Sequence, residues 1–302
     1  MPKRVFVSYS HKQGDWVWDR LVPVLRAGGA EPLVDRERFK LGRALFDQMD
    51  ALQDEADVQL LCLSEDYLAS PACCHEMERA VALDPDFKKN VVVPVKVAEV
   101  DLPPAIRSAN PLYADLRGGR ISAAWDLVLA ACDADLGTTV PQWLEARDEV
   151  RTLLGRNQGV NLVVQGNANW AGLIEHLREE LHLPEVDLES GATETREGLM
   201  RAILLALEVK LPAATDVLSL ETFEGLIDRL EPKRLALTHF HYAAHRPGSY
   251  DWNLFGSLRH LTMTRRKLIL LVQSRQPYMS ILPADHPLSK INLHQVRLSG
   301  YL

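Results

Sequence analysis

The sequence predicts two consecutive α/β domains, and the first should be built on a parallel sheet of five strands. Short apolar runs without internal polar alternation are interspersed with amphipathic stretches along the chain. This pattern is typical of buried parallel strands joined by crossover helices. The chain has 302 residues, enough for two domains of ordinary size. Gly137 to Pro141 combines glycine, threonine and proline, which stop helices and form linkers, so we expect domains at 1–136 and 142–302 joined by a linker at 137–141.

The first domain should contain five strands separated by helices. We expect strands at residues 5–9, 31–35, 58–63, 91–97 and 112–115, and helices at 15–27, 44–55, 72–83 and 121–133. Apolar residues recur at three and four positions in each helical stretch. Pro23 should kink or tighten the first helix, because proline lacks a backbone donor.

The second domain should also be a doubly wound α/β sheet. A helix at 142–154 precedes a strand at 161–165 and a helix at 171–181. Further helices are expected at 195–209 and 220–230, and further strands at 235–240 and 268–272. This alternation again favours parallel strands with crossover helices.

Composition excludes several classes of protein. The formal net charge of −7 argues against a general nucleic-acid binder, although a modest basic cluster runs from Arg259 to Arg275. The apolar runs fall far short of the roughly 20 residues that cross a membrane, and no signal-peptide core follows Lys3 and Arg4. We therefore expect a cytoplasmic protein with no membrane partner. The four cysteines are too few and too unevenly spaced for a disulfide framework and should be reduced thiols.

Polar residues follow the expected strands of the first domain at the points where each strand ends. Tyr9 and Ser10 end the first strand, and Asp35 ends the second and opens a charged loop to Gly42. Glu76 lies about one turn inside the helix that follows the third strand. Because ligands gather at the carboxyl ends of parallel strands, these residues predict a ligand site there.

These segments resemble the TIR (Toll/interleukin-1 receptor) domain family, particularly its bacterial members. The resemblance covers residues 3–135 and implies the flavodoxin-like TIR fold. It depends on several ordered motifs: VFVSYS at 5–10, LVD at 33–35, LG of the BB loop at 41–42, YLASP at 67–71, VPV at 93–95, DLPP at 101–104 and YADL at 113–116.

The resemblance implies an enzyme that cleaves NAD⁺ at its nicotinamide–ribose bond, with Glu76 as the catalytic carboxylate. It also implies substrate-binding roles for Tyr9, Ser10, Asp35, Gly42, Arg43 and Cys73. NAD⁺ would be the substrate, no cofactor would be required, and the product would be ADP-ribose or a cyclic isomer. Enzymatic members commonly act when self-assembled through their TIR domains, in prokaryotic defence against phage.

One departure from the family pattern favours a different function. Enzymatic relatives commonly carry tryptophan four residues before the glutamate, where this sequence has Ala72. The alternative is a non-enzymatic TIR scaffold that binds other TIR domains, with Glu76 merely complementing the dipole of its helix. Trp16 or a neighbouring subunit would have to supply the missing aromatic surface in the enzyme.

The second domain resembles a degenerate STAND-type NTPase of the P-loop class. Leu173 and Ile174 occupy the positions where a phosphate-binding loop needs lysine and a hydroxyl residue, and the strand at 235–240 lacks the terminal acid of a Walker B motif. ATP hydrolysis is therefore not expected, and the domain should serve regulation, oligomerisation or an operon-encoded protein partner. A remaining possibility is nucleotide binding without hydrolysis, through Arg275 and the basic cluster.

Three histidines in the second domain lie close enough in the sequence to suggest metal binding. His239, His241 and His245 lie near the end of an expected strand. Alternate histidines at such a position are usually ordinary polar residues, so no metal site is expected.

Overall fold

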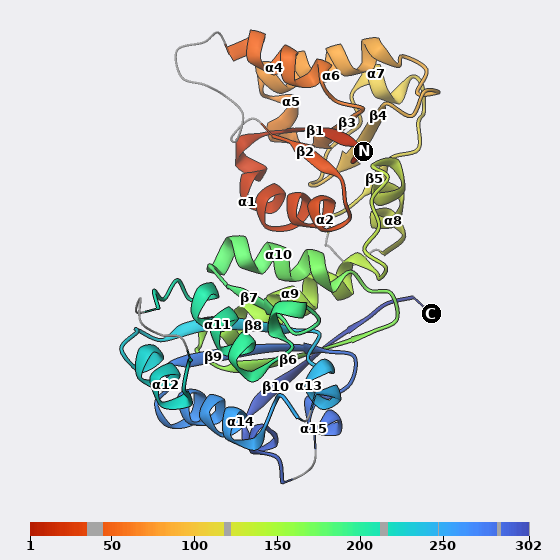
Figure 1. Cartoon of the computed structure of the whole chain (residues 1–302). Coiled ribbons are helices and arrows are strands. Elements are labelled where there is room, and N and C mark those ends of the chain that lie inside the picture. Colours follow the sequence, from red (N-terminus) through yellow and green to blue (C-terminus); the bar gives the residue numbers. More distant parts are fainter. Residues whose placement is uncertain (35–44, 118–121, 212–216, 247, 283–284, 302) are drawn as a thin grey trace. The chain divides into compact units, whose positions relative to one another are not determined.

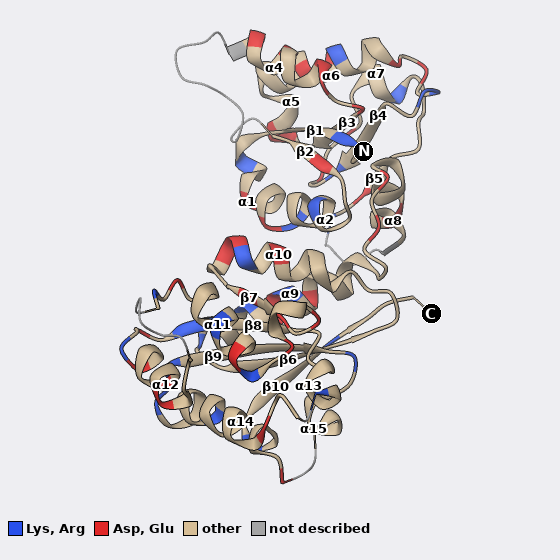
Figure 2. Cartoon of the chain, in the orientation of Figure 1, with Lys and Arg blue, Asp and Glu red and all other residues tan. Residues whose placement is uncertain are grey.

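The computed structural model describes residues 1–34, 45–117, 122–211, 217–246, 248–282 and 285–301. The chain forms two compact units, Met1–Leu144 and Glu145–Leu302 (Figure 1). Within the described ranges, no helix is long and apolar enough to cross a membrane. Acidic and basic residues are interspersed along both units (Figure 2).

The first unit contains the predicted parallel sheet of five strands. Its strands lie in the order β2-β1-β3-β4-β5 and every neighbouring pair is parallel. The bounds are β1 Arg4–Tyr9, β2 Glu31–Leu33, β3 Val58–Leu63, β4 Val92–Lys96 and β5 Ala114–Asp115. All six side chains of β3 are buried, as expected for a central strand covered on both faces.

Helices cover both faces of this sheet. Figure 1 shows α1, α2 and α8 on one face and α4, α6 and α7 on the other. Their bounds are α1 Gly14–Trp16, α2 Val22–Ala27, α4 Leu45–Asp54, α5 Glu65–Leu68, α6 Pro71–Leu83, α7 Pro104–Arg107 and α8 Ser122–Ala131.

Pro23 perturbs the first helical run as predicted. The run continues from α1 through a π-helical turn at Val17–Leu21 into α2, with Pro23 in the first turn of α2. Proline cannot donate the hydrogen bond that a regular helix needs at this position, so a locally widened turn before it accommodates the missing donor.

The second unit contains its own parallel five-stranded sheet, in the order β10-β6-β9-β8-β7. The bounds are β6 Gly159–Gln165, β7 Glu185–Asp187, β8 Lys233–Thr238, β9 Leu268–Ser274 and β10 Leu293–Ser299. Both edge strands, β7 and β10, were missing from the sequence prediction. The first has three residues, and the second alternates polar and apolar positions because only one of its faces packs on the core.

The helices of the second unit begin with α9, which starts at Val140, inside the stretch expected to be a linker. Figure 1 shows α9 and α10 on one face of the sheet and α12 and α14 on the other. The bounds are α9 Val140–Gly155, α10 Trp170–Leu181, α11 Arg196–Ala206, α12 Leu220–Asp228, α13 Tyr242–His245, α14 Trp252–Arg259 and α15 Tyr278–Ile281.

Candidate functional site

Three buried side chains from distant parts of the first unit meet near the carboxyl end of β1. Ser8 is 1% exposed, Tyr67 is 0% exposed and Glu76 is 7% exposed. The Oγ of Ser8 lies 2.7 Å from the Oη of Tyr67 and donates a hydrogen bond to Oε2 of Glu76. A carboxylate is thus held at the sheet edge where parallel α/β folds bind ligands.

The start of α6 determines where Glu76 points. Ser70 caps this helix by accepting a hydrogen bond from the backbone N–H of Cys73, and Pro71 occupies the first turn, where its missing donor has no cost. Glu76 therefore lies one turn inside the helix on the face that meets β1.

Helix α4 holds this part of α6 from the other side. Gln53 donates from Nε2 to the backbone oxygen of Glu76 at 2.9 Å. Nε2 of His75 lies 2.9 Å from Oδ1 of Asp50, and Nη2 of Arg79 donates a hydrogen bond to Oδ1 of Asp54 at 2.7 Å. These contacts hold the helix backbone in place at Glu76 and at residues on either side of it in the chain.

The surroundings of Tyr67 decide the direction of the hydrogen bonds. Burial raises the pKa of its phenol well above 10, and the charge of Glu76 raises it further, whereas the hydrogen bond with Ser8 opposes these effects. Tyr67 consequently keeps its proton and donates to Ser8, which in turn donates to Glu76. Two neutral hydroxyl groups in series therefore orient one carboxylate.

Two more of the predicted binding residues lie beside this group. The Sγ of Cys73 lies 3.5 Å from the backbone oxygen of Tyr9, and the Oη of Tyr9 accepts a hydrogen bond from Nε1 of Trp18 at 3.0 Å. Ser10 is used locally, since its side chain caps the short turn at His11–Gln13. Asp35, Gly42 and Arg43 lie outside the described residues.

The structure shows how the position of the missing tryptophan is surrounded. Ala72 is half-buried in the first turn of α6. Trp16 was considered as a substitute aromatic surface, and it stacks on Trp125 with ring centroids 5.9 Å apart and planes inclined by 19°. One face of Trp16 is therefore already used in packing.

The cysteines are free thiols, as predicted. Cys62, Cys73 and Cys132 are buried, and burial raises the pKa of the Cys132 thiol to about 12. Burial also raises the pKa of Cys62. A thiol with a raised pKa is a poor nucleophile, so Cys62 and Cys132 serve packing.

Sequence reasoning missed Ser8 and Tyr67 as members of this group. Both lie inside motifs that were noted, VFVSYS and YLASP. However, the contacts join residues 59 and 68 positions apart in the chain, and only the folded sheet brings them together.

The loop after β6 in the second unit takes the place of a phosphate-binding loop. Gly166 has a φ of +64°, and Asn169 caps α10 by accepting from the N–H of Gly172 at 2.9 Å. Leu173 and Ile174 are buried in the core. The loop therefore caps its own helix with a side chain and offers no lysine or hydroxyl at the positions that would reach phosphates and magnesium.

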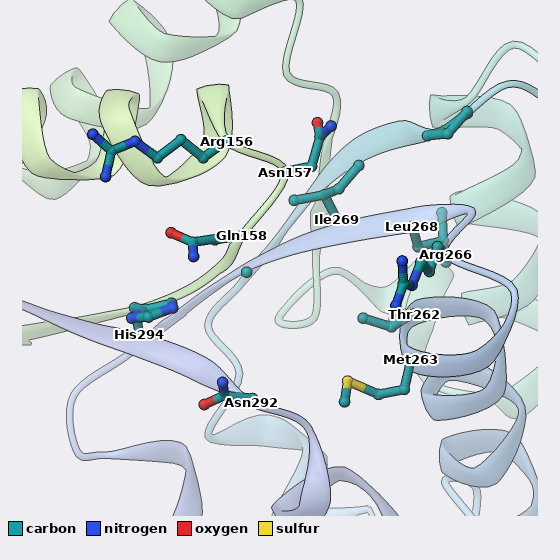
Figure 3. A pocket seen from close by; sticks show the side chains of 12 residues that line it. Arg156, Asn157, Gln158, Thr262, Met263, Arg266, Leu268, Ile269, Asn292 and His294 are labelled. Carbon is teal, nitrogen blue, oxygen red and sulfur yellow. The ribbon is translucent and has the colours of Figure 1, made fainter.

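The second unit also has a cavity of about 530 Å³, at the amino ends of its strands (Figure 3). Arg156, Arg266 and His294 line it together with several amide side chains. Arg156 follows the end of α9 and Arg266 follows the π-helical turn at His260–Thr264. Cations complement the negative ends of helix dipoles, which accounts for both arginines without a ligand.

Comparisons with known proteins find a family match within the first unit. Residues 5–129 match the family model of the TIR domain. The TIR domain of a Toll-related receptor from Hydra magnipapillata is 14% identical, with a TM-score of 0.38, and the match covers 43% of this chain and 97% of that one. A prokaryotic SEFIR domain is 18% identical, with a TM-score of 0.32 and coverage of 43% and 92%.

A Walker-type ATPase of Pyrococcus abyssi is also among the structural neighbours. It is 14% identical, with a TM-score of 0.41, and the match covers 52% of this chain and 53% of that one. Structural similarity at TM-scores below 0.5 does not support an inference about function. No curated protein matches the chain.

The first unit contains a TIR domain. The family match and the five-stranded parallel sheet agree on this point. This match supports a TIR-type function, either signalling or NAD⁺ cleavage.

Proposed function

We propose that the TIR domain cleaves the N-glycosidic bond between nicotinamide and ribose in NAD⁺, with Glu76 as the catalytic carboxylate. The observation that carries this proposal is the buried hydrogen-bonded group of Glu76, Ser8 and Tyr67 at the carboxyl end of the sheet. The hydrogen bond from Ser8 orients the carboxylate at this position.

The chemistry requires one well-placed anion. As the C1′–N bond breaks, its electron pair leaves with nicotinamide, which becomes neutral, and positive charge develops on the ribose. The carboxylate of Glu76 stabilises this oxocarbenium-like sugar. Water then adds to C1′ and loses a proton, which gives ADP-ribose; attack by a nitrogen of the adenine instead gives a cyclic isomer. Protonation of the leaving group is unnecessary because nicotinamide departs as a neutral molecule.

The test is nicotinamide release by the purified full chain incubated with NAD⁺, both dilute and under conditions that promote assembly. Glu76→Ala and Glu76→Gln should lower the rate by on the order of 100-fold or more, since both remove the charge that stabilises the transition state. Glu78→Ala is the matched control, because Glu78 lies two residues further along α6 and is exposed. Equal rates in wild type and Glu76→Gln contradict the proposal.

A non-enzymatic TIR scaffold is the second candidate, and Ala72 is the observation that favours it. Without tryptophan at this position, the site lacks the stacking surface common in enzymatic relatives, and Trp16 already stacks on Trp125. Such a stacking contact contributes about 0.5–1.5 kcal/mol beyond burial, so its loss weakens substrate binding without removing the chemistry. Absence of nicotinamide release from every assembled form supports the scaffold.

In either case we propose that the TIR domains self-associate and that residues 142–302 control the assembly. The second unit has a complete α/β sheet, yet its loop after β6 lacks the lysine of a phosphate-binding loop. A fold of this kind without its catalytic residues suits regulation or a protein partner. From the resemblance to bacterial TIR proteins, we also propose a role in defence against phage.

A further inference from the structure

Two neighbouring strands of the second unit bring an unassigned group of side chains together. Asp187 is the last residue of β7, Glu189 follows two residues later, and His239 comes directly after β8. The strands are parallel and Asp187 pairs with Thr238, so both ends lie at the same edge of the sheet. One ligand-type atom from each of the three residues lies within 4.8 Å of the others.

The backbone fixes the position of His239. Its φ is +50°, a conformation that costs energy for a residue with a side chain, and its backbone N–H donates to Oε1 of Gln273 at 2.8 Å. Gln273 is buried in the adjacent strand β9. The indole of Trp170 packs edge-to-face with the imidazole of His239, with ring centroids 5.0 Å apart. The imidazole is therefore held in one place.

The contacts of the ring assign its tautomer. Nδ1 lies 2.7 Å from Oδ1 of Asp187, a hydrogen bond to an acceptor that requires the proton on Nδ1. Nε2 is the ring nitrogen that remains for a second partner. It faces Oε2 of Glu189 at 3.4 Å, and the other oxygen of that carboxylate accepts from the Oη of Tyr242 at 2.8 Å.

Imidazole nitrogen and carboxylate oxygen are both common ligand atoms for transition metals. A charge-assisted N–H···O bond is shorter, about 2.7–2.9 Å. A separation of 3.4 Å matches the ligand–ligand edge of a tetrahedron whose metal–nitrogen and metal–oxygen bonds are about 2.0–2.1 Å. The two atoms are therefore spaced as two ligands of one metal ion would be.

A neighbouring histidine gives an independent observation. Nδ1 of His241 is buried and has no hydrogen-bond partner among the residues that the structure describes, and its ring lies 6.0 Å from that of His239. An imidazole nitrogen without a partner among the described residues is a further potential ligand at this edge.

We propose that the second unit binds a divalent transition metal of the zinc type through Nε2 of His239 and Oε2 of Glu189. Asp187 is a positioning residue that holds Nδ1, in the carboxylate–histidine–metal arrangement typical of such sites. Imidazole and carboxylate ligands together favour zinc over magnesium or calcium. All three side chains are partly exposed, so the ion exchanges with solvent and is not needed for folding.

The experiment uses untagged full-length protein treated with a chelator and then dialysed. Zn²⁺ titration by calorimetry should show one saturable site, and Co²⁺ should give the intense visible absorption of a tetrahedral complex. His239→Ala and Glu189→Gln should abolish this binding, and Asp187→Asn should weaken it by about 10–100-fold. His294→Ala, which alters a histidine at the other edge of the same sheet, should bind as wild type does.

Circular dichroism melting of every variant checks that it folds, and Glu189→Gln changes an exposed side chain that the fold does not need. The proposal is overturned if wild type shows no saturable Zn²⁺ binding. It is also overturned if folded Glu189→Gln and His239→Ala bind as wild type does, or if blocking the cysteine thiols removes the binding. This result is independent of NAD⁺ cleavage, because the site lies in the other unit.

Discussion

The two units carry acidic groups at the carboxyl ends of similar parallel sheets, but they hold them in different ways. In the first unit, Glu76 comes from a helix, is buried, and accepts a hydrogen bond from the hydroxyl of Ser8. In the second, Asp187 and Glu189 follow a short edge strand, remain partly exposed, and face the two nitrogens of His239.

This difference shows that the fold decides where a ligand site lies, whereas the neighbouring side chains decide its chemistry. Hydroxyl groups that donate to a carboxylate orient it and favour its charged form, which suits stabilisation of a developing positive charge on a substrate. A histidine between two carboxylates instead collects lone pairs around one point, which suits a resident cation. Three predictions examine this comparison.

The largest effect is expected from Ser8→Ala in the TIR domain, a prediction that rests on the proposed NAD⁺ cleavage. The change removes the hydroxyl that links Tyr67 to Glu76, so nicotinamide release should fall by about 10–100-fold, because small errors in position carry large rate penalties. The effect should appear in kcat more than in KM, and Ser8→Thr, which keeps a hydroxyl, should recover part of the rate.

Ser108→Ala provides the control for this experiment, since that side chain is exposed and donates a hydrogen bond to the nearby backbone oxygen of Ala105. If Ser8→Ala lowers the melting temperature without changing kcat, the hydroxyl stabilises the fold and does not position Glu76.

A smaller effect is expected from Gly166→Ala in the second unit. Gly166 has a φ of +64°, and an added Cβ would lie 2.7 Å from the backbone oxygen of Tyr301. The free energy of unfolding should fall by about 1–3 kcal/mol, measured by urea denaturation. Gly155→Ala is the control, because no atom lies within 4 Å of its added Cβ. Equal stability of the two variants would show that the loop moves freely and is not held by the end of the chain.

The smallest effect is a difference between the two units in how their stability depends on pH. Burial lowers the pKa of His176, His241 and His286 in the second unit. Their neutral forms favour the fold, so this contribution is present above about pH 6.5 and is lost as the pH falls towards the lowered values. Hydrogen exchange measured by mass spectrometry should show the second unit losing protection between pH 7 and 5.

The first unit should lose stability at a lower pH than the second unit. A backbone hydrogen bond from Arg4 lowers the pKa of Asp57, and the side chain of Arg117 lowers that of Asp115. Stabilisation by these carboxylates is present above about pH 4 and is lost below it. His286→Asn keeps an acceptor for the N–H of Leu288 but cannot titrate, so it should reduce the change in the second unit. Parallel loss of protection in both units between pH 7 and 5 contradicts the prediction.

Much of the fold could be predicted from apolar patterning. All five strands of the first unit and three of the second were expected close to their observed positions, because buried parallel strands are continuous apolar runs. Two edge strands were missed, since β7 is three residues long and β10 alternates in polarity. The apolar spacing of Leu254, Leu258 and Leu261 also predicts a helix, and α14 was overlooked there.

The candidate sites were less predictable than the fold. Glu76 was found because motif spacing placed it one turn inside α6, whereas Ser8 and Tyr67 were not recognised as its partners. The histidines of the second unit were judged to be ordinary polar residues because the carboxylates beside His239 belong to β7, a strand that the sequence prediction lacked.

The sequence by itself determined the two parallel sheets, the TIR family of the first domain and the loss of phosphate-binding residues in the second. Each of these depends on residues close together in the chain. Only the tertiary structure decided which side chains meet at the sheet edges, because Tyr67 and Ser8, or His239 and Asp187, are separated by more than 50 residues. Such contacts are created when strands pair, and no local pattern records them.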